Sequence, residues 1–257
     1  MPDQRTSDAE PSRAAELMRR LAAGTEQLKL PVEAAALKGL IDYILLLERW
    51  NRTWNLTAVR DAESMLDRHL LDSLSVVPFL YGNRFLDVGT GAGLPGIPLA
   101  LTLPTAQVYM VDSNAKKTRF VQQAIASLRL PNASVEQARV EQLQQLRVEE
   151  VLGGSVDTLV SRAFSAPLDI ISRCRHLCVP GSRILFMLGA LEQQFDTLPD
   201  DIELENIHRV SVTQNGTQSG HERAAPLVTA VNNSEPAGEP AGKPETPQRP
   251  IAVCRIH

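Results

Sequence analysis

The sequence predicts an α/β fold in which a mostly parallel β-sheet follows a helical extension. From residue 83 onward, strand-like apolar runs alternate with helical stretches, a pattern typical of βαβ units. Before that point, apolar residues recur at helical spacing. A strand also runs directly into a glycine-rich loop and a helix, at residues 84–103. The chain has 257 residues, of which 43% are hydrophobic, and this suffices for one α/β domain with a small addition.

The helical extension is expected to span residues 11–82. It follows a polar and charged segment, residues 1–10, which we expect to be disordered. Pro31 suits the first turn of a helix, where an N–H would have no helical partner. One apolar face is then formed by Leu37, Leu40, Ile41, Ile44 and Leu47. The expected helices cover residues 11–30, 31–50 and 62–77, with a polar loop at residues 51–57.

Strands and helices alternate through residues 83–213, which we expect to form the main domain. Strands are predicted at residues 84–88, 107–111, 134–138, 156–161 and 183–188, with a sixth at residues 203–213. Helices are predicted between them at residues 95–103, 115–129 and 167–177. Because helical crossovers join parallel neighbours, the sheet is expected to be mostly parallel.

The composition changes in the C-terminal part. Residues 214–250 are rich in Pro, Gly, Ser and Glu and hold few large apolar side chains. Burial cannot offset the entropy of ordering such a segment, so we expect this insert to be disordered. Residues 251–257 regain strand character, and we expect them to return to the sheet as an edge strand beside the sixth strand.

Composition and charge argue against several classes of protein. The formal net charge of −4 argues against a general nucleic-acid coat, because non-specific binding requires the neutralisation of many phosphates. No apolar run is long enough to span a bilayer, and the N-terminus does not resemble a secretory signal. Three cysteines, Cys174, Cys178 and Cys254, do not suit a disulfide framework. We therefore expect a cytoplasmic, monomeric protein with reduced thiols and no membrane partner.

A short pattern, Cys174-x-His176-x-Cys178, could suggest a metal site. The apolar Leu177 and the predicted helix favour packing of these side chains over zinc binding. We expect no bound metal.

The most informative feature is the segment from Phe85 to Gly96, with the sequence FLDVGTGAGLPG. Glycine at alternate positions lets the backbone adopt positive φ and lets a ligand approach closely. In open α/β sheets, ligands bind at this place, outside the carboxyl ends of the strands. Asp112 closes the second strand, where its carboxylate could accept hydrogen bonds from ribose hydroxyls.

Two cofactors fit this loop, and a third interpretation is a glycine turn without a ligand. Gly91, Gly93 and Gly96 match the dinucleotide pattern G-x-G-x-x-G, with an acidic residue about twenty residues further on. S-adenosylmethionine is favoured because Asp87 stands two residues before the first glycine. The preceding helical extension and the residues 139–141 after the third strand, where adenine would lie, favour it as well.

Taken together, several motifs resemble the RsmG family, also called GidB, of bacterial small-subunit rRNA guanine-N7 methyltransferases. The motifs that carry the resemblance are Trp50-Asn51 through Asn55-Leu56-Thr57, Arg68-His69-Leu70-Leu71-Asp72-Ser73, Asp87 through Pro98, Asp112-Ser113, Lys116-Lys117, Arg119-Phe120, Arg139-Val140-Glu141 and Ser161-Arg162-Ala163-Phe164. Their order and spacing cover roughly residues 30–190. The resemblance implies a Rossmann-like, seven-stranded class I methyltransferase fold with S-adenosylmethionine as the cofactor.

The resemblance also implies the reaction and the site. The methyl group would be transferred to N7 of a guanine in 16S rRNA, guanine 527 in this family, with the rRNA or the small ribosomal subunit as partner. The implied cofactor residues are Gly89, Leu94, Val140, Glu141 and Arg162. To these we add Gly91 from the loop and Asp112 for the ribose.

Methylation of guanine N7 makes modest demands on side-chain chemistry. The atom carries an exposed lone pair and no proton, so the reaction needs no general base and no covalent nucleophile. The protein supplies placement and electrostatics, while the cofactor carries the reactive group. Arg162 follows the fourth predicted strand, and we hypothesise that it orients the cofactor or guanine O6. A surface arginine in a salt bridge is the alternative.

Basic residues near the expected mouth of the site are candidate RNA contacts. Lys116, Lys117 and Arg119 begin one helix, and Arg68 and His69 come from the helical extension. A solvated charge is an equally good interpretation of each basic side chain. For His69, a packed histidine is favoured.

Other features bear on the RNA surface. Trp50 and Trp54 could stack on bases, but we expect them to anchor the helical extension. Leu188 stands where the family usually has a lysine after the fifth strand, and the insert at residues 214–250 replaces a basic stretch. Both departures concern the C-terminal half of the expected RNA surface and leave the cofactor half intact.

Three other functions stay open at this point. The first is a methyltransferase that uses S-adenosylmethionine on a small molecule or a protein, with the helical extension as a lid. The second is an NAD-dependent oxidoreductase. The third is an RNA-binding module that has lost catalysis.

Overall fold

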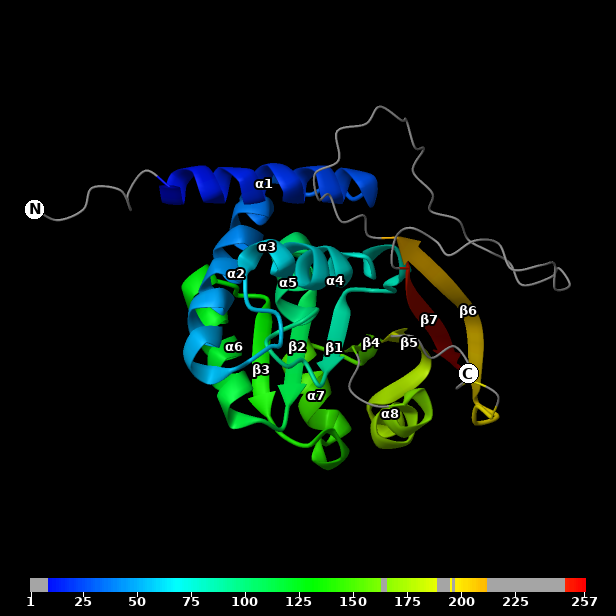
Figure 1. Ribbon diagram of the computed structural model, residues 1–257. Helices are drawn as coiled ribbons and strands as arrows, with labels where there is room; N and C mark the ends of the chain where they lie inside the picture. Colours follow the sequence, from blue (N-terminus) through cyan, green and yellow to red (C-terminus); the bar gives the residue numbers. More distant parts are fainter. Residues whose placement is uncertain (1–8, 163–165, 189–194, 196, 212–247) are drawn as a thin grey trace, which may run out of the picture.

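The computed structural model describes residues 9–162, 166–188, 195, 197–211 and 248–257. Its centre is a seven-stranded sheet with the strand order β3-β2-β1-β4-β5-β7-β6. The strands β1 to β5 pair in parallel, whereas β7 runs antiparallel to both β5 and β6. Helices flank this sheet, and α1 crosses above them at one end of the molecule (Figure 1).

The strands of the sheet confirm the predicted α/β fold. They are β1 (Arg84–Val88), β2 (Gln107–Asp112), β3 (Ala133–Gln137), β4 (Val156–Arg162), β5 (Cys178–Met187), β6 (Ile202–Ser211) and β7 (Gln248–Ile256). Parallel strands between two helical layers have to be apolar on both faces. Accordingly, Phe85, Leu86 and Val88 of β1 are all at most 2% exposed.

Helices join the strands and cover the sheet. They are α5 (Gly96–Thr102), α6 (Ala115–Leu128), α7 (Gln145–Leu152) and α8 (Pro167–Cys174), with the short 3₁₀ helices η3 (Val140–Gln142) and η4 (Arg175–Leu177). The sequence did not predict α7, because only Val148 and Leu152 of this helix are buried and its apolar periodicity is weak. The predicted helix at residues 167–177 is α8 continued by η4.

The helical extension differs from its predicted boundaries. It consists of α1 (Ala9–Gln27), α2 (Ala34–Trp54), α3 (Ala62–Met65), the π-helical stretch η1 (Leu66–Leu71), α4 (Asp72–Leu74) and the 3₁₀ helix η2 (Val77–Phe79). α1 begins inside the segment predicted to be disordered. α2 runs four residues into the predicted loop and ends at Asn55, whose left-handed backbone (φ 50°) caps the helix.

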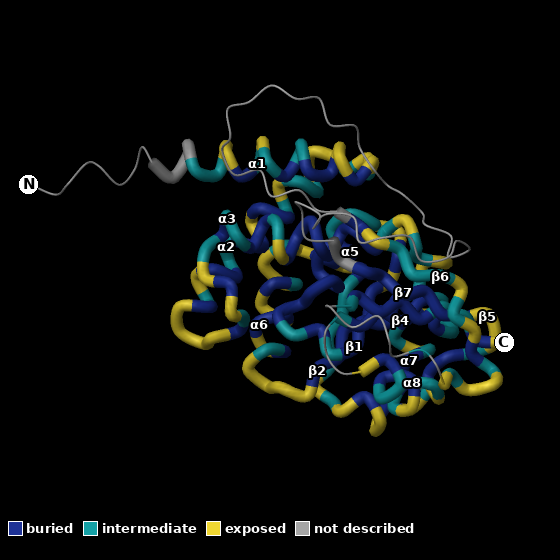
Figure 2. The backbone as a smooth tube through the Cα atoms, turned by 45° about the vertical axis from the view of Figure 1, so that its right-hand side comes forward, coloured by how far each residue is buried: buried dark blue, intermediate teal, exposed yellow. Residues whose placement is uncertain are grey.

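Two hydrophobic clusters lie on the two faces of the sheet. One joins the extension to the main domain and includes Leu47, Ile97 and Phe120. The other includes Tyr109 and Leu159 and lies under α7 and α8. Figure 2 shows buried segments in α3 and α5 as well as in the strands, and α2 contributes Leu47 to the first cluster. The extension is therefore part of the same core.

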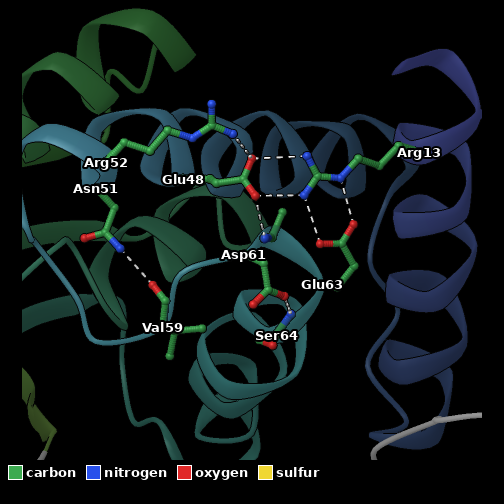
Figure 3. Close-up of polar contacts among 9 residues, drawn as sticks. Arg13, Glu48, Asn51, Arg52, Val59, Asp61, Glu63 and Ser64 are labelled. Carbon is green, nitrogen blue, oxygen red and sulfur yellow. Dashed lines mark hydrogen bonds and ion pairs between the residues drawn. The ribbon is translucent and has the colours of Figure 1, made fainter. Parts of the chain in front are cut away.

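α1 is fastened to this core by an ion cluster (Figure 3). The guanidinium of Arg13 forms ion pairs of 2.7 Å with both Glu48 and Glu63. Glu48, on α2, also accepts a hydrogen bond of 3.0 Å from the backbone N–H of Ala62 at the start of α3. One buried carboxylate thus links three helices.

The last strand does not lie where the sequence placed it. We predicted an edge strand beside the sixth, but β7 lies between β5 and β6, and β6 forms the edge. The reason is burial on both faces: Ile251, Ala252, Cys254 and Ile256 are all 0% exposed. β7 begins at Gln248, inside the insert predicted to be disordered; the rest of that insert lies almost entirely outside the described residues.

Candidate cofactor site

The glycine loop between β1 and α5 is fixed by positive φ angles. Gly89, Gly91 and Gly93 have φ of 69°, 61° and 90°, a region that favours glycine. At Gly93 a Cβ atom would lie 2.6 Å from Cγ1 of Ile97, so a side chain has no room there. The loop is tied to β2, because the N–H of Gly89 donates to the carbonyl oxygen of Val111 at 2.8 Å.

Asp87 lies beneath this loop and is only 1% exposed. Its Oδ2 accepts hydrogen bonds from the hydroxyl of Thr90 at 2.6 Å and from the N–H of Gly96 at 2.8 Å. Its Oδ1 is buried without a hydrogen-bond partner. Burial raises the pKa of this carboxyl to about 6, although these hydrogen bonds and the charge of Arg162 act in the opposite direction.

Asp112 shapes the other side of the loop. Its Oδ2 accepts a hydrogen bond from the N–H of Gly91 at 2.9 Å, and its Oδ1 accepts one from the N–H of Asn114 at 2.8 Å. Beside it, an open pocket lies at the carboxyl ends of β1 and β2 and runs to the residues after β3. The pocket is lined by Val88, Gly89, Val111, Asp112, Ser113, Ala138, Arg139, Val140, Glu141 and Arg173. This is the crevice where α/β sheets bind ligands.

The structure brings most of the predicted cofactor residues to this pocket. Gly89, Asp112, Val140 and Glu141 line it, and Gly91 borders it through its hydrogen bond to Asp112. The side chain of Leu94 is instead buried in the core below the loop, at 7% exposure.

Sequence reasoning missed one residue of the pocket wall. Arg173, on α8, lies with its Nη1 3.4 Å from Oε1 of Glu141 and its Nε 2.9 Å from Oδ1 of Asp169. No motif marks Arg173, because its sequence neighbours suit any amphipathic helix. Only the return of α8 toward η3 places it at the pocket.

Arg162 lies at the end of β4, outside the pocket lining. Its Nε is 3.3 Å from Oδ2 of Asp72, and its Nη2 is 3.1 Å from both the carbonyl oxygen of Arg68 and Nδ1 of His69. Its Nη1 is buried without a hydrogen-bond partner. β4 pairs with β1, so this unpartnered donor and the unpartnered Oδ1 of Asp87 belong to adjacent strands.

His69 is not placed as a contact for RNA phosphates, which corrects that prediction. It is 5% exposed, and its Nε2 lies 2.9 Å from the hydroxyl of Thr57. The π-helical turn carries the imidazole inward, in agreement with the packed histidine that the sequence favoured. Thr57 and Asp72 stood in the recognised motifs without an assigned role, and only the tertiary contacts reveal their connection to Arg162.

The other basic candidates lie on α6 and η1. Lys116, Arg119 and Arg68 are exposed, and Lys117 is half-buried. Asn114 caps α6 by accepting from the N–H groups of Lys116 and Lys117. Nζ of Lys117 lies 4.0 Å from the position that a Cβ atom of Gly91 would take, so this ammonium adjoins the glycine loop.

The extension also touches the loop directly. The hydroxyl of Tyr43, on α2, donates to the carbonyl oxygen of Ala92 at 2.7 Å, and Tyr43 is fully buried. Trp50 packs edge-on against Phe120 with ring centroids 5.6 Å apart, as expected of an anchor. Trp54 is 41% exposed.

The cysteine and histidine pattern serves packing. Nε2 of His176 lies 3.0 Å from the carbonyl oxygen of Leu143, and Cys174 and Cys178 are buried. Burial raises the pKa of both thiols to about 12. Within the described ranges, no three His, Cys, Asp or Glu side chains are grouped to hold a metal ion. No helix in the part of the chain that the structure describes is both long and apolar enough to cross a membrane.

Comparison with known proteins gives consistent matches. The model of the family described as rRNA small subunit methyltransferase G matches residues 36–223. The Ribosomal RNA small subunit methyltransferase G of Nitrosococcus oceani is 41% identical over 192 residues, which are 74% of this chain and 86% of that protein. The proteins of the same name from Alkalilimnicola ehrlichii and Stutzerimonas stutzeri are 46% and 43% identical, over 71% and 78% of this chain and 80% and 90% of their own lengths.

Proposed function

This chain belongs to the family of rRNA small subunit methyltransferase G, and from that premise we infer that it transfers a methyl group from S-adenosylmethionine to a guanine of small-subunit rRNA. The observation that carries this function is the family match over residues 36–223. We propose N7 as the acceptor atom and 16S rRNA, alone or within the small subunit, as the partner.

The residues at the carboxyl ends of β1, β2 and β4 fit this cofactor. Asp112 and Glu141 offer carboxylate acceptors at the pocket, and Val140 offers an apolar contact. Arg162 Nη1 and Asp87 Oδ1 are a buried donor and a buried acceptor that lack hydrogen-bond partners among the described residues. A ligand that ends in both a carboxylate and an ammonium could supply a partner for each, and buried polar groups are rarely left unsatisfied.

In this reaction the protein mainly has to position the cofactor and the guanine. When bound, S-adenosylmethionine supplies an electrophilic methyl group. Because guanine N7 has a free lone pair, no side chain has to remove a proton. The glycine loop and Asp112 would hold the cofactor, and we propose that Arg162 orients either the cofactor or guanine O6. The buried, preorganised setting of Arg162 makes such an electrostatic contact stronger than it would be in water.

We propose that Lys116, Lys117, Arg119 and Arg68 contact rRNA phosphates around the mouth of the site. Phosphate contacts of this kind orient the RNA without reading its sequence. His69 has no part in this surface because it is buried. Action as a monomer in the cytoplasm, where ribosomal subunits are available, stays a prediction.

The function is tested by mapping 7-methylguanine in small-subunit rRNA from cells with and without the protein. We expect one guanine to lose its modification in the deletion strain and to regain it when the gene is restored. The purified protein with methyl-labelled S-adenosylmethionine should label small subunits or 16S rRNA. An unchanged modification pattern, together with no labelling of either RNA substrate, would reject the function.

The earlier alternatives make different predictions for the same experiment. A methyltransferase of small molecules or proteins would bind S-adenosylmethionine but would not require ribosomal RNA. An NAD-dependent oxidoreductase would bind the dinucleotide in its place, and family membership gives that alternative no support. An RNA-binding module without catalysis would bind subunits and leave them unlabelled.

A further inference from the structure

A chain of partly buried polar contacts runs from the helical extension to Arg162. Its inner part is the guanidinium itself, which η1 and α4 hold through Nε and Nη2, while Nη1 has no hydrogen-bond partner among the described residues. Its outer part begins at Thr57, in the loop between α2 and α3. His69 lies between the two parts and contacts both.

Thr57 is held in place from α2. Its N–H donates to Oδ1 of Asn51 at 2.9 Å, and Nδ2 of Asn51 donates to the carbonyl oxygen of Val59 at 2.8 Å; the latter contact is visible in Figure 3. Asn51 is 1% exposed. The loop is thus pinned on both sides of Thr57, and the hydroxyl of Thr57 has a defined position against the imidazole.

The hydroxyl of Thr57 affects which tautomer His69 adopts. A guanidinium is always a donor, so Nδ1 of His69 can accept from Arg162 only when Nδ1 carries no proton. In that tautomer the proton is on Nε2, and the hydroxyl oxygen of Thr57 is its acceptor at 2.9 Å. In the other tautomer Nδ1–H would donate to the carbonyl oxygen of Arg68, also 2.9 Å away, and the contact with Arg162 would be lost. The hydroxyl of Thr57 can serve either tautomer, because it can accept from Nε2–H or donate to an unprotonated Nε2. Without it, the tautomer that accepts from Arg162 loses the acceptor of its Nε2–H, whereas the second tautomer has no Nε2–H to satisfy.

The π-helical geometry of η1 makes the arrangement possible. Asp72, His69 and the carbonyl group of Arg68 all face one side chain from consecutive turns of η1 and α4. Wider turns of this type free backbone carbonyl groups and recur at functional sites. Here the carbonyl group of Arg68 is one that receives the guanidinium.

We propose that Thr57 and His69 are positioning residues for methyl transfer, which act by holding the Arg162 guanidinium so that its Nη1 faces the reacting partners. This rests on the proposed function, in which Arg162 orients the cofactor or the guanine. The helical extension then has a role in the reaction besides covering the sheet, because it sets the geometry of a residue on β4.

The test compares Thr57→Val, which keeps the shape of the side chain and removes the hydroxyl, with Thr57→Ser, which keeps the hydroxyl. Single-turnover methylation of small subunits is measured with methyl-labelled S-adenosylmethionine. Thr57→Val removes the hydrogen bonds of this hydroxyl with Nε2 of His69 and with the N–H of Val59, and we expect it to slow the reaction about 10-fold, which corresponds to about 1.4 kcal/mol. Thr57→Ser should restore the rate to within about 2-fold of the wild type.

Two controls separate positioning from stability. Thr25→Val removes a buried hydroxyl from α1, where it donates only to the carbonyl oxygen of Ala22, so it should change the unfolding midpoint as much as Thr57→Val and leave the methylation rate unchanged. In an Arg162→Ala background, Thr57→Val should cause no further loss, because its effect passes through the missing guanidinium.

The proposal is overturned by any of three results. These are a wild-type rate for Thr57→Val, an equal loss for Thr25→Val, or a loss that persists in the Arg162→Ala background. Failure of the proposed function is recognised separately, because the wild-type protein would then not methylate small subunits at all, and that result overturns both.

Discussion

At the scale of single residues, Asp87 combines the most unusual environment with the clearest consequence for pH. Its carboxyl is fully buried under the glycine loop, and one of its oxygens has no hydrogen-bond partner in the part of the chain that the structure describes. Burial raises its pKa in the folded protein from 3.8 to about 6. The folded state therefore binds a proton more tightly than the unfolded state does.

The sign of the linkage follows from that order. Below pH 3.8 Asp87 is protonated in both states, and the buried carboxyl is neutral. The stability that this neutral form contributes to the folded state is lost as the pH rises through about 6. The full effect is about 3 kcal/mol. We expect the free energy of unfolding of the wild type, measured with urea, to increase relative to that of Asp87→Asn as the pH falls from 7.5 to 4.5. A difference that does not change with pH would contradict this.

The pH dependence of cofactor binding is a second, independent test of the protonation of Asp87. If Asp87 pairs with the cofactor's ammonium, binding favours the ionised form, so affinity for S-adenosylmethionine should rise between pH 5 and 7. Calorimetry should show this rise for the wild type and not for Asp87→Asn. If the affinity of the wild type and that of Asp87→Asn changed with pH in the same way, Asp87 would not pair with the ammonium of the cofactor.

The backbone of the glycine loop leads to a second residue-scale prediction. Gly93→Ala combines an unfavourable φ with a Cβ atom 2.6 Å from Cγ1 of Ile97. Gly153→Ala, after α7, has a similar φ of 71° and nothing within 4 Å. We expect Gly153→Ala to cost about 1–2 kcal/mol of stability from the backbone alone. Gly93→Ala should cost more and should also weaken binding of S-adenosylmethionine; equal effects of the two changes would contradict the steric argument.

At the scale of elements, the docking of α1 depends on Arg13. Removing this guanidinium would leave the carboxylate of Glu48, whose side chain is 10% exposed, without its main partner. We expect Arg13→Ala to lower the free energy of unfolding by about 1–2 kcal/mol, less than for a fully buried pair because Arg13 is 38% exposed. Urea unfolding measures this.

The matched control for Arg13 is Arg19, on the same helix. Arg19 pairs with Glu16 one turn away, and the side chains are 72% and 53% exposed. Arg19→Ala should leave the free energy of unfolding essentially unchanged, because solvent screens this exposed pair. If both variants lose the same amount, the ion cluster does not fasten α1.

The elements also show what can be predicted from the sequence and what cannot. β1 was predicted with its observed boundaries, because a continuous apolar run ends in a glycine loop. The glycine loop was predicted for the same reason, since its residues are contiguous, and its role in binding the cofactor stays a prediction. The π-helical turn was not predicted. A packed His69 was the favoured interpretation, but its contacts with Thr57 and Arg162 could not be predicted. The partners of Arg162 are distant in sequence, and no local rule connects them.

At the scale of the whole molecule, the sheet depends on β7. This strand pairs with β5 on one side and with β6 on the other, and it is buried on both faces. Deleting residues 248–257 would leave two strand edges unpaired and open both hydrophobic clusters. We expect the truncated protein to lose cooperative thermal unfolding, as followed by circular dichroism.

The control lies in the same strand. The side chain of Arg255 is 41% exposed and pairs with Glu205. Arg255→Ala should leave the cooperative transition in place with a small shift of its midpoint, because the backbone pairing of β7 is unchanged. A truncated protein that unfolds as cooperatively as this variant would show that β7 is dispensable.

The order of the last three strands has a consequence for how the gene can change. β5 and β6 are neighbours along the chain, yet the partner that separates them in the sheet comes from beyond Ser211, after 36 intervening residues. The two ends of that connection, Ser211 and Gln248, pair with each other in the sheet. Because the entropy of closing a loop grows with the logarithm of its length, doubling this connection would cost only about 0.6 kcal/mol. Codons can therefore be gained or lost between β6 and β7 with little effect on the sheet, which makes this the place where lineages can diverge in length while keeping one architecture.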